Sequence, residues 1–313
     1  MKVAFVIDPI ETFAIHKDST YMMLKAGSAR NWQQYVVQIN DLFIEDGTAY
    51  GDMRLFNFNA NSGSWYLLGE PEKINLSEFH AIFMRKDPPF DMSYIYATYV
   101  LSTAQKEGAL VVNDPQALRN INEKVSIVKY PECTPKTLVT KSFKQINDFL
   151  ACYQDIVVKP LGGMGGDSVF RIQPGDHNKN VILETITQNQ ERFIMAQQYQ
   201  PEIEQGDKRI LIINGQPLEY LVVRIPGPGD FRGNVARGAT TSIRKLTARE
   251  YDIAVTVGKD LKAEGVLFAG IDMIGEALTE INITSPTMIQ EIYNESGVDA
   301  ASILMDVIAE KLI

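Results

Sequence analysis

The sequence is poor in the residue types that carry covalent catalysis or bind zinc. Its 313 residues include two cysteines, Cys133 and Cys152, and three histidines, His16, His80 and His177. The cysteines have neither CxxC spacing nor enough partners for a zinc site or a disulfide framework. The scattered histidines complete no Ser/His/Asp or Cys/His arrangement. We therefore interpret the cysteines as reduced and structural, and expect no covalent enzyme intermediate.

The chain also lacks a long hydrophobic run and an excess of positive charge. The apolar run at residues 1–7 breaks at Asp8 and is too short for a signal peptide. No other run approaches the length needed to span a bilayer. A net charge of -9 and a pI near 5.0 argue against a general nucleic-acid or acidic-membrane surface. We expect a cytoplasmic globular protein without nucleic-acid or membrane partners, in which any phosphate binding is local.

The first third alternates strands and helices, which predicts an α/β class with an open, largely parallel sheet. The expected strands are 3–7, 35–39, 81–84 and 109–112, and the expected helices are 19–29, 92–106 and 114–122. Arg85 follows one of these strands, at the sheet edge where such folds bind ligands. It is a candidate for holding an anionic substrate, and the alternative is a surface arginine in a proline-rich turn. The alternation ends near Glu123, where we predict a domain boundary.

Residues 155–172 contain a glycine-rich loop between two expected strands. Lys159 ends the first strand, four glycines lie within residues 162–166, and residues 168–172 resume as a strand. Backbone N–H groups of glycines can approach a phosphate closely and bind it as an anion. No Gly-Lys-Ser/Thr opens a helix here, so the loop is not a Walker A motif. A hairpin covering nucleotide phosphates is favoured over a glycine-rich turn without a ligand.

A second expected hairpin, residues 266–283, carries acidic residues. The turn at 275–277 places Asp272 opposite Glu280, with Asn282 beside Glu280 and Gly270 across from it. Facing carboxylates repel each other in a sheet, and a hard cation with oxygen ligands, such as Mg²⁺, would remove that repulsion. The alternative is a solvated acidic face.

A third expected hairpin brings cations together. The Asn-Gly turn at 214–215 pairs Arg209 with Tyr220 and places Arg209 and Arg224 on one face, near Asp207. Such guanidinium groups suit a transferring phosphoryl group or a carboxylate. The following Gly- and Pro-rich stretch contains Arg232, which favours a lid closing on an anionic intermediate over a disordered linker.

Together these features suit phosphoryl transfer without a protein nucleophile. The chain resembles the ATP-grasp ligases, and within them the bacterial glutathione synthetase family, along nearly its full length. The stretches that carry the resemblance are residues 84–91, 113–119, 122–124, 159–166, 206–209, 224–226, 232–234 and 279–286. The resemblance implies an ATP-grasp fold with an N-terminal α/β domain (1–122), a small lid domain (123–198) and a C-terminal antiparallel-sheet domain (199–313).

The same resemblance implies a reaction and a set of ligands. Glutathione, ADP and phosphate would form from γ-glutamylcysteine, glycine and ATP through an acyl phosphate, with two Mg²⁺ ions (or Mn²⁺), in a homotetramer. The ATP-binding residues would be Lys124, Lys159, Gly163, Met164, Gly165, Gly166, Gln197, Gln198, Tyr199 and Asp207, the last facing the ribose. The metal ligands would be Asp272, Glu280 and Asn282.

For the peptide and the chemistry, the resemblance implies arginines. Arg209, Arg224 and Arg232 would be catalytic, and the substrate-binding residues would be Arg85, Arg224, Arg232, Asn234 and Ser285. The chain departs from the family pattern at Gly162, where relatives usually have Asp, and at residues 235–242, where they have more glycine.

Two alternatives compete with this interpretation. Another carboxylate-amine ligase would share the fold, but residues 84–91 follow the glutathione synthetase pattern. A module that senses Mg-ATP without turnover would not need to keep Arg209, Glu280 and Asn282, which act on a transferring phosphoryl group.

Overall fold

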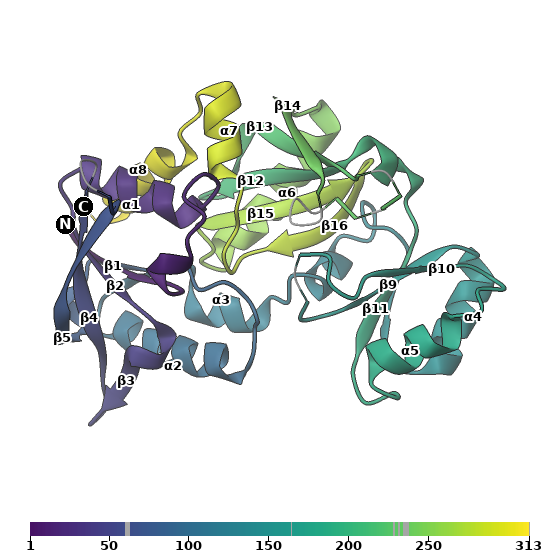
Figure 1. Ribbon diagram of the computed structural model, residues 1–313, viewed down its shortest axis with the longest axis horizontal. Helices are drawn as coiled ribbons and strands as arrows, with labels where there is room; N and C mark the ends of the chain where they lie inside the picture. Colours follow the sequence, from purple (N-terminus) through teal and green to yellow (C-terminus); the bar gives the residue numbers. More distant parts are fainter. Residues whose placement is uncertain (60–62, 164, 228, 231, 234–237, 313) are drawn as a thin grey trace.

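The computed structural model describes residues 1–59, 63–163, 165–227, 229–230, 232–233 and 238–312. Within these residues the strands form three sheets, of seven, four and five strands. Figure 1 shows the five-stranded sheet in the middle of the molecule, with the seven-stranded sheet on one side and the four-stranded sheet on the other. The mixed α/β class is as predicted.

The seven-stranded sheet has the order β3-β4-β2-β1-β6-β7, with β5 paired to β4. Strands β1, β2, β6 and β7 are parallel, whereas β3, β4 and β5 are antiparallel. The parallel half was predicted, and the antiparallel half was not. The strands are β1 (Lys2–Val6), β2 (Gln33–Val37), β3 (Leu42–Glu45), β4 (Thr48–Phe58), β5 (Tyr66–Asn75), β6 (Ala81–Met84) and β7 (Leu110–Val112).

Three helices that flank this sheet begin at side-chain caps. Helix α1 (Ser19–Ala29) is capped by Asp18, α2 (Met92–Lys106) by Asp91, and α3 (Pro115–Asn120) by Asp114. In each case the carboxylate accepts a hydrogen bond from a free N–H of the first turn. The first two helices agree with the prediction, and α3 ends two residues before the predicted Asn122.

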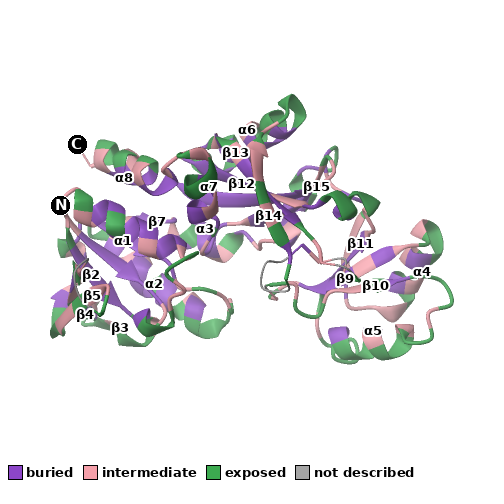
Figure 2. Ribbon diagram, turned by 45° about the horizontal axis from the view of Figure 1, so that its top comes forward, coloured by how far each residue is buried: buried purple, intermediate pink, exposed green. Residues whose placement is uncertain are grey.

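The four-stranded antiparallel sheet has the order β10-β9-β11-β8. Its strands are β8 (Thr137–Thr140), β9 (Ile156–Pro160), β10 (Phe170–Ile172) and β11 (Ile194–Gln198), covered by α4 (Phe143–Tyr153) and α5 (Lys179–Thr187). The hydrophobic core here consists of residues from this part alone, for example Leu150, Val158 and Leu183. Figure 2 shows these strands and helices as a small separate layer.

The five-stranded antiparallel sheet has the order β14-β13-β12-β15-β16. Its elements are β12 (Asp207–Ile213), β13 (Gln216–Ile225), β14 (Thr240–Lys245), β15 (Phe268–Ile274), β16 (Ala277–Asn282), α6 (Ala248–Ala263), α7 (Ile289–Ser296) and α8 (Ala300–Lys311). The last helix packs against the N-terminal part, where Arg30 forms an ion pair of 2.6 Å with Asp306. Figure 1 accordingly shows α8 beside α1. The domain boundaries at 122 and 198 stay predictions.

Short 3-10 helices complete the described fold: η1 (Ile10–Thr12), η2 (Ile39–Asp41), η3 (Leu76–Glu78), η4 (Val125–Lys129) and η5 (Pro201–Gln205). No helix in the described ranges combines the length and the apolar character that crossing a bilayer requires.

Candidate active site

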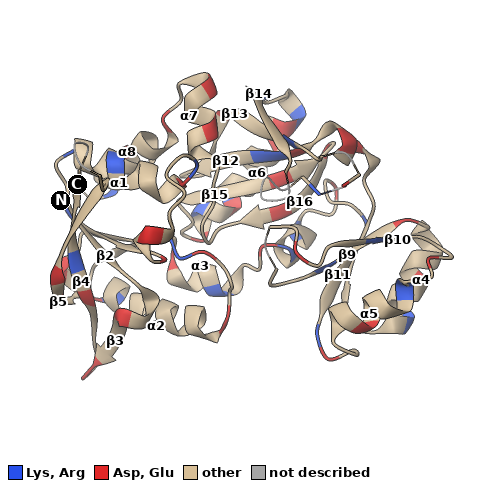
Figure 3. Ribbon diagram, viewed as in Figure 1, with Lys and Arg blue, Asp and Glu red and all other residues tan. Residues whose placement is uncertain are grey.

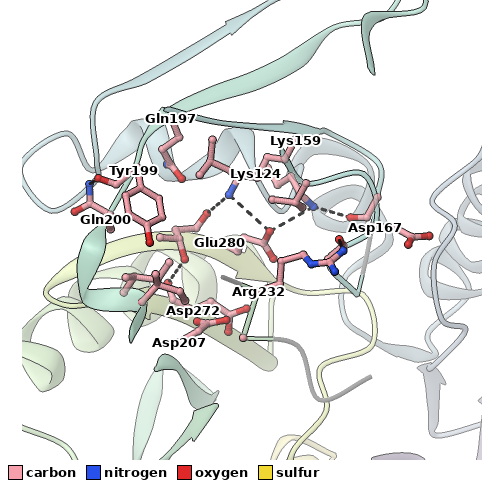
Figure 4. A pocket seen from close by; sticks show the side chains of 18 of the residues that line it. Lys124, Lys159, Asp167, Gln197, Tyr199, Gln200, Asp207, Arg232, Asp272 and Glu280 are labelled. Atoms are coloured by element: carbon pink, nitrogen blue, oxygen red, sulfur yellow. Dashed lines mark hydrogen bonds and ion pairs between the residues drawn. The ribbon is translucent and has the colours of Figure 1, made fainter. Parts of the chain in front are cut away.

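A cavity between the four-stranded and five-stranded sheets collects most of the predicted nucleotide-binding residues. Figure 4 shows Lys124 and Lys159 pointing toward Glu280 from one side, with Asp207 and Asp272 on the other. The predicted residues that line the cavity are Lys124, Lys159, Gly163, Gly165, Gly166, Gln197, Gln198, Tyr199, Asp207, Arg232, Asp272 and Glu280. The structure thus brings together residues that lie up to 156 positions apart in the chain, from Lys124 to Glu280.

The two lysines reach the cavity from different places in the chain, Lys124 just before η4 and Lys159 from β9. Lys124 donates a hydrogen bond of 2.6 Å to the carbonyl oxygen of Gly163 and lies 3.5 Å from Glu280. Lys159, at the end of β9, lies 3.8 Å from the same carboxylate. Burial lowers the pKa of Lys159, and the nearby Glu280 partly offsets this effect. Both ammonium groups therefore face one carboxylate across the cavity.

The glycine-rich loop lies between β9 and β10 and contributes three glycines to the cavity wall. Gly165 and Gly166 have φ angles of 63° and 75°, which only glycine adopts at little cost. This explains why two glycines follow each other where the loop turns. Met164, also predicted to contact ATP, lies outside the described residues.

The acidic hairpin β15–β16 has the predicted pairs. Asp272 lies opposite Glu280 and Gly270 opposite Asn282. The turn differs from the prediction: Ile274 pairs with Ala277, so the loop has two residues, and a bulge after Asp272 restores the predicted register. The missing side chain at Gly270 leaves room for Arg209, because a Cβ atom there would lie 2.8 Å from Cδ of Arg209.

Two buried arginines converge on the Asp272 carboxylate. Arg209 donates two hydrogen bonds to it, one of 2.8 Å from Nη2 and a shorter one from Nε. Arg224 lies 3.0 Å from Asp272 and 2.5 Å from Asp207. Burial would raise the pKa of Asp272, but the two guanidinium groups outweigh it and hold the pKa well below its usual range. Figure 3 shows Lys or Arg positions and Asp or Glu positions on neighbouring strands of the central sheet.

The register of the β12–β13 hairpin differs from the prediction. Arg209 pairs with Val222, not with Tyr220, because an irregularity between Ile210 and Ile212 shifts the pairing by two residues. A shift of two residues keeps every side chain on its original face of the sheet. Arg209 and Arg224 therefore still lie on one face, as predicted, and Arg224 pairs with Asp207.

The argument that led to a metal at Asp272 and Glu280 needs a correction. Their repulsion is already offset without a metal, by Arg209 and Arg224 at one carboxylate and by Lys124 and Lys159 at the other. In the described part of the chain no three His, Cys, Asp or Glu residues form a metal-binding group.

The oxygen ligands nevertheless fit a hard cation. Asp272 and Glu280 line the cavity, and the amide nitrogen of Asn282 donates to Asp272 at 3.3 Å, which leaves its amide oxygen available. Two carboxylates and an amide leave coordination positions for phosphate and water, which is how Mg²⁺ usually binds in proteins.

Asp207 lines the cavity, and its carboxylate is only partly paired. One of its oxygens accepts from Arg224, whereas Oδ1 is buried and has no hydrogen-bond partner among the described residues. Burial raises the pKa of Asp207 to about 6, against the lowering effect of Arg224. An unpaired buried acceptor is costly, so a ligand hydroxyl at this position would stabilise the site.

Arg232 connects the glycine-rich loop with the stretch after β13. It forms an ion pair of 2.7 Å with Asp230 and donates to the carbonyl oxygen of Gly166 at 3.3 Å. The remaining predicted residue of this stretch, Asn234, lies outside the described residues, as do residues 235–237 of the segment 235–242.

Several residues of the cavity wall were not predicted. They are Val157, Pro160, Asp167, Val169, Gln200, Ile203, Gly233, Ile274 and Thr279. Alternation along β9 could have indicated Val157, which lies two residues before Lys159 on the same strand face. Tyr199 also has an unforeseen neighbour, because the guanidinium of Arg171 stacks on its ring at 3.7 Å while pairing with Asp155.

Arg85 and Ser285 line a second cavity, which lies at the carboxyl ends of strands β1 and β6 of the seven-stranded sheet. Its wall comprises Asp8, Thr12, Phe13, Asp18, Ser19, Thr20, Arg85, Asp87, Ser285 and Thr287. Arg85 is buried and donates to Thr20 Oγ1 at 3.1 Å and to the carbonyl oxygen of Pro286 at 3.0 Å. Burial lowers its pKa, although Asp87 and Asp18 oppose this effect.

Comparison with known proteins identifies the family. The model of the prokaryotic glutathione synthetase N-terminal domain matches residues 1–119, and that of the prokaryotic glutathione synthetase ATP-grasp domain matches residues 123–297. The chain belongs to the prokaryotic glutathione synthetase family. Glutathione synthetase of Nitrosomonas europaea is 46% identical over 315 residues, covering 100% of this chain and 98% of that protein. For Vibrio cholerae glutathione synthetase the identity is 44% over 312 residues, with the same coverage.

A solved structure supports the fold. The ATP-grasp ligase PsnB complexed with a minimal precursor has a TM-score of 0.63 at 17% identity, covering 99% of each chain. The predicted ATP-grasp fold is thereby confirmed. Family membership also confirms the predicted ATP-dependent ligase that forms glutathione, and with it the use of ATP and a divalent metal.

Proposed function

We propose that ATP binds in the cavity between the four-stranded and five-stranded sheets, with its phosphates under the glycine-rich loop. The observation that carries this proposal is the meeting of Lys124 and Lys159 at Glu280, directly beneath the loop. Gln197, Gln198 and Tyr199 then face adenine, and the free Oδ1 of Asp207 accepts from a ribose hydroxyl.

Asp272, Glu280 and Asn282 hold magnesium in this proposal, as two ions, and manganese can replace it. A divalent ion held by these residues would supply neutralisation of phosphate charge, which is a large part of catalysis in phosphoryl transfer. Arg209 stabilises the transferring phosphoryl group, and its bond with Asp272 fixes the guanidinium before the reaction begins.

The peptide substrate binds through the Arg85 cavity. Among the ion pairs of the described residues none includes Arg85, although this guanidinium is buried. Asp18 and Asp87 favour the charge of Arg85 without pairing with it directly, so a substrate carboxylate would stabilise the site by supplying a direct ion pair. The loops after the neighbouring strands β1 and β6 line this cavity. After β1 the chain continues to β2 on one side of the pair, and after β6 it continues to β7 on the other side. Ligands of open α/β sheets commonly bind at such a point.

The reaction proceeds in two steps. A carboxylate oxygen of γ-glutamylcysteine attacks the γ-phosphorus of ATP, giving an acyl phosphate and ADP. The glycine amine then attacks the carbonyl carbon, phosphate leaves, and the amine loses a proton as the peptide bond forms. Arg224 and Arg232 hold the acyl phosphate, and closure of the stretch around Arg232 excludes water. Assembly into a tetramer and a cytoplasmic location stay predictions.

The decisive experiment measures ADP release by the purified protein with Mg-ATP and γ-glutamylcysteine, with and without glycine. We expect release that depends on glycine, with an equal amount of glutathione. Turnover only with other carboxylate and amine pairs would favour another ligase of the same fold, and ATP binding without any turnover would favour a sensor.

A further inference from the structure

Glu123 lies directly after the N-terminal part of the chain, and its side chain holds a segment 160 residues away in the sequence. Its Oε1 accepts from the Thr284 hydroxyl at 2.7 Å and from the backbone N–H groups of Ile283 and Thr284 at 3.3 and 3.4 Å. Its own carbonyl oxygen accepts from Ile281 N–H at 2.8 Å. Glu123 therefore fixes the backbone where β16 ends.

The held residues lie between two parts of the site. Asn282, a proposed metal ligand, precedes them, and Ser285 and Pro286 follow. The Pro286 carbonyl accepts from Arg85 at 3.0 Å, and the Ser285 hydroxyl donates to the Arg85 carbonyl at 3.3 Å. Any shift of residues 283–284 would therefore move the wall of the Arg85 cavity.

The neighbours of Glu123 contact the nucleotide cavity instead. Asn122 donates to the Leu161 carbonyl at 3.3 Å, and Lys124 donates to the Gly163 carbonyl at 2.6 Å. Three consecutive residues thus touch the base of the phosphate loop, the end of the acidic hairpin and the phosphate loop itself. This tripeptide is a fixed connection between the two cavities.

We propose that Glu123 is a positioning residue for the peptide substrate: through residues 283–284 it fixes the Arg85 cavity relative to the nucleotide cavity. The proposal rests on the proposed function, because it takes the Arg85 cavity as the peptide site. Glu123 is not among the residues that line either cavity. Its effect is expected on peptide affinity and not on ATP affinity, since Lys124 and Lys159 reach the phosphates independently of its carboxylate.

The test compares binding by calorimetry and steady-state kinetics for the wild type and Glu123→Gln. Glutamine keeps the shape but is a weaker, uncharged acceptor. We expect the Kd and KM for γ-glutamylcysteine to rise about tenfold, the loss typical when bonds to a charged group are weakened. The Kd for Mg-ATP should change less than about twofold. Glu264→Gln is the matched control, since Glu264 pairs with Lys129 on the surface at 2.9 Å.

A second pair of variants tests the same contact from the other side. Thr284→Ser keeps the hydroxyl and should retain wild-type peptide affinity, whereas Thr284→Val should weaken it as Glu123→Gln does. Combining Glu123→Gln with Thr284→Val should then weaken binding less than the product of the two single effects.

The proposal is overturned by unchanged peptide affinity in Glu123→Gln, by equal losses for ATP and peptide, or by equal behaviour of Thr284→Ser and Thr284→Val. Because peptide binding is measured directly, these outcomes do not depend on turnover. A wild type that binds the peptide without forming glutathione would contradict the proposed function alone.

Discussion

The two cavities balance their positive charge in different ways. At the nucleotide cavity Lys124 and Lys159 face Glu280, and Asp272 in the cavity wall pairs with the buried Arg209 and Arg224. In the second cavity Arg85 bonds only to a hydroxyl and a carbonyl oxygen among its described partners.

The difference has a physical meaning. A cluster that already contains opposite charges keeps its geometry without a ligand. It can accept both a phosphate and a metal ion, because its cations attract the phosphate and its carboxylates attract the metal. A buried guanidinium that has carboxylates nearby but none in direct contact gains its ion pair from the ligand, so affinity there depends on an anion. The nucleotide cavity is thus preorganised, whereas the Arg85 cavity, if it is the peptide site as proposed, would be completed by its substrate.

The largest expected effect is a loss of activity when the charge pairing of the nucleotide cavity is broken. Glu280→Gln removes one carboxylate from the proposed metal site and leaves Lys124 and Lys159 without a counter-charge. We expect kcat to fall by about a hundred- to a thousandfold, with the fold intact. Glu276→Gln is the control, because it removes the same charge from the exposed turn of the same hairpin. Near-normal activity of Glu280→Gln over a range of Mg²⁺ concentrations would contradict the metal assignment.

The next effect compares the two buried arginines by stability. Arg209→Met leaves Asp272 buried with Arg224 as its remaining cation. Breaking such a pair should lower the free energy of unfolding by about 3 kcal/mol. Arg85→Met removes a buried charge that has no carboxylate partner, so we expect a change within about 1 kcal/mol. Denaturant unfolding of both variants measures the contrast, and equal losses would show that Arg85 is also balanced within the protein.

The sequence predicted the elements with strong local signals. The helices expected at 19–29 and 92–106 form, with Asp18 and Asp91 as their caps. The predicted pairs of Asp272 with Glu280 and of Gly270 with Asn282 form because a bulge compensates for a turn one residue shorter than predicted. Strands β3 to β5 were missed, although Asp46 and Gly47, with φ angles of 51° and 83°, form the kind of turn that joins such strands.

The site was predictable in its residue types and less so in its contacts. The irregularity that pairs Arg209 with Val222 begins at the pair of Ile212 with Pro217. Proline has no N–H for the ladder and often marks a bulge, so Pro217 was a local signal that the prediction did not use. The neutralisation of Asp272 by two arginines depends on three strands meeting, so the sequence suggested a metal where side chains already supply the charge.

A third charge cluster provides a purely structural reference for the comparison. Burial would raise the pKa of Glu250, but hydrogen bonds from Arg244, Lys208 and the Thr247 N–H outweigh it and lower the pKa to about 2. A folded pKa below the ordinary value of 4.5 contributes stability that is fully present above pH 4.5 and is lost as pH falls toward 2.

Glu250→Gln should therefore lower the free energy of unfolding by about 2 kcal/mol at pH 7, and the gap to the wild type should narrow below pH 4.5. Urea unfolding of the variant and the wild type at several pH values measures this difference in the free energy of unfolding. Glu219→Gln serves as control, because Glu219 pairs with Lys245 at the exposed surface and should show almost no gap. A gap that is constant with pH would mean that the Glu250 charge is not what stabilises the cluster.

The smallest expected effect concerns two glycines of the phosphate loop and sharpens the view of the nucleotide cavity as preorganised. A Cβ atom at Gly162 meets nothing within 4 Å, and its φ is not positive, so this departure from the family pattern leaves room for a side chain. Gly165 also has open space, but its φ of 63° disfavours any other residue, by about 1 kcal/mol.

Gly165→Ala should therefore raise the KM for ATP about fivefold, whereas Gly162→Ala should change it less than about twofold. Both variants should leave the KM for γ-glutamylcysteine unchanged. Equal effects of the two would mean that the loop adjusts its backbone when ATP binds, and the contrast between a preformed nucleotide cavity and a substrate-completed Arg85 cavity would then not hold for this loop.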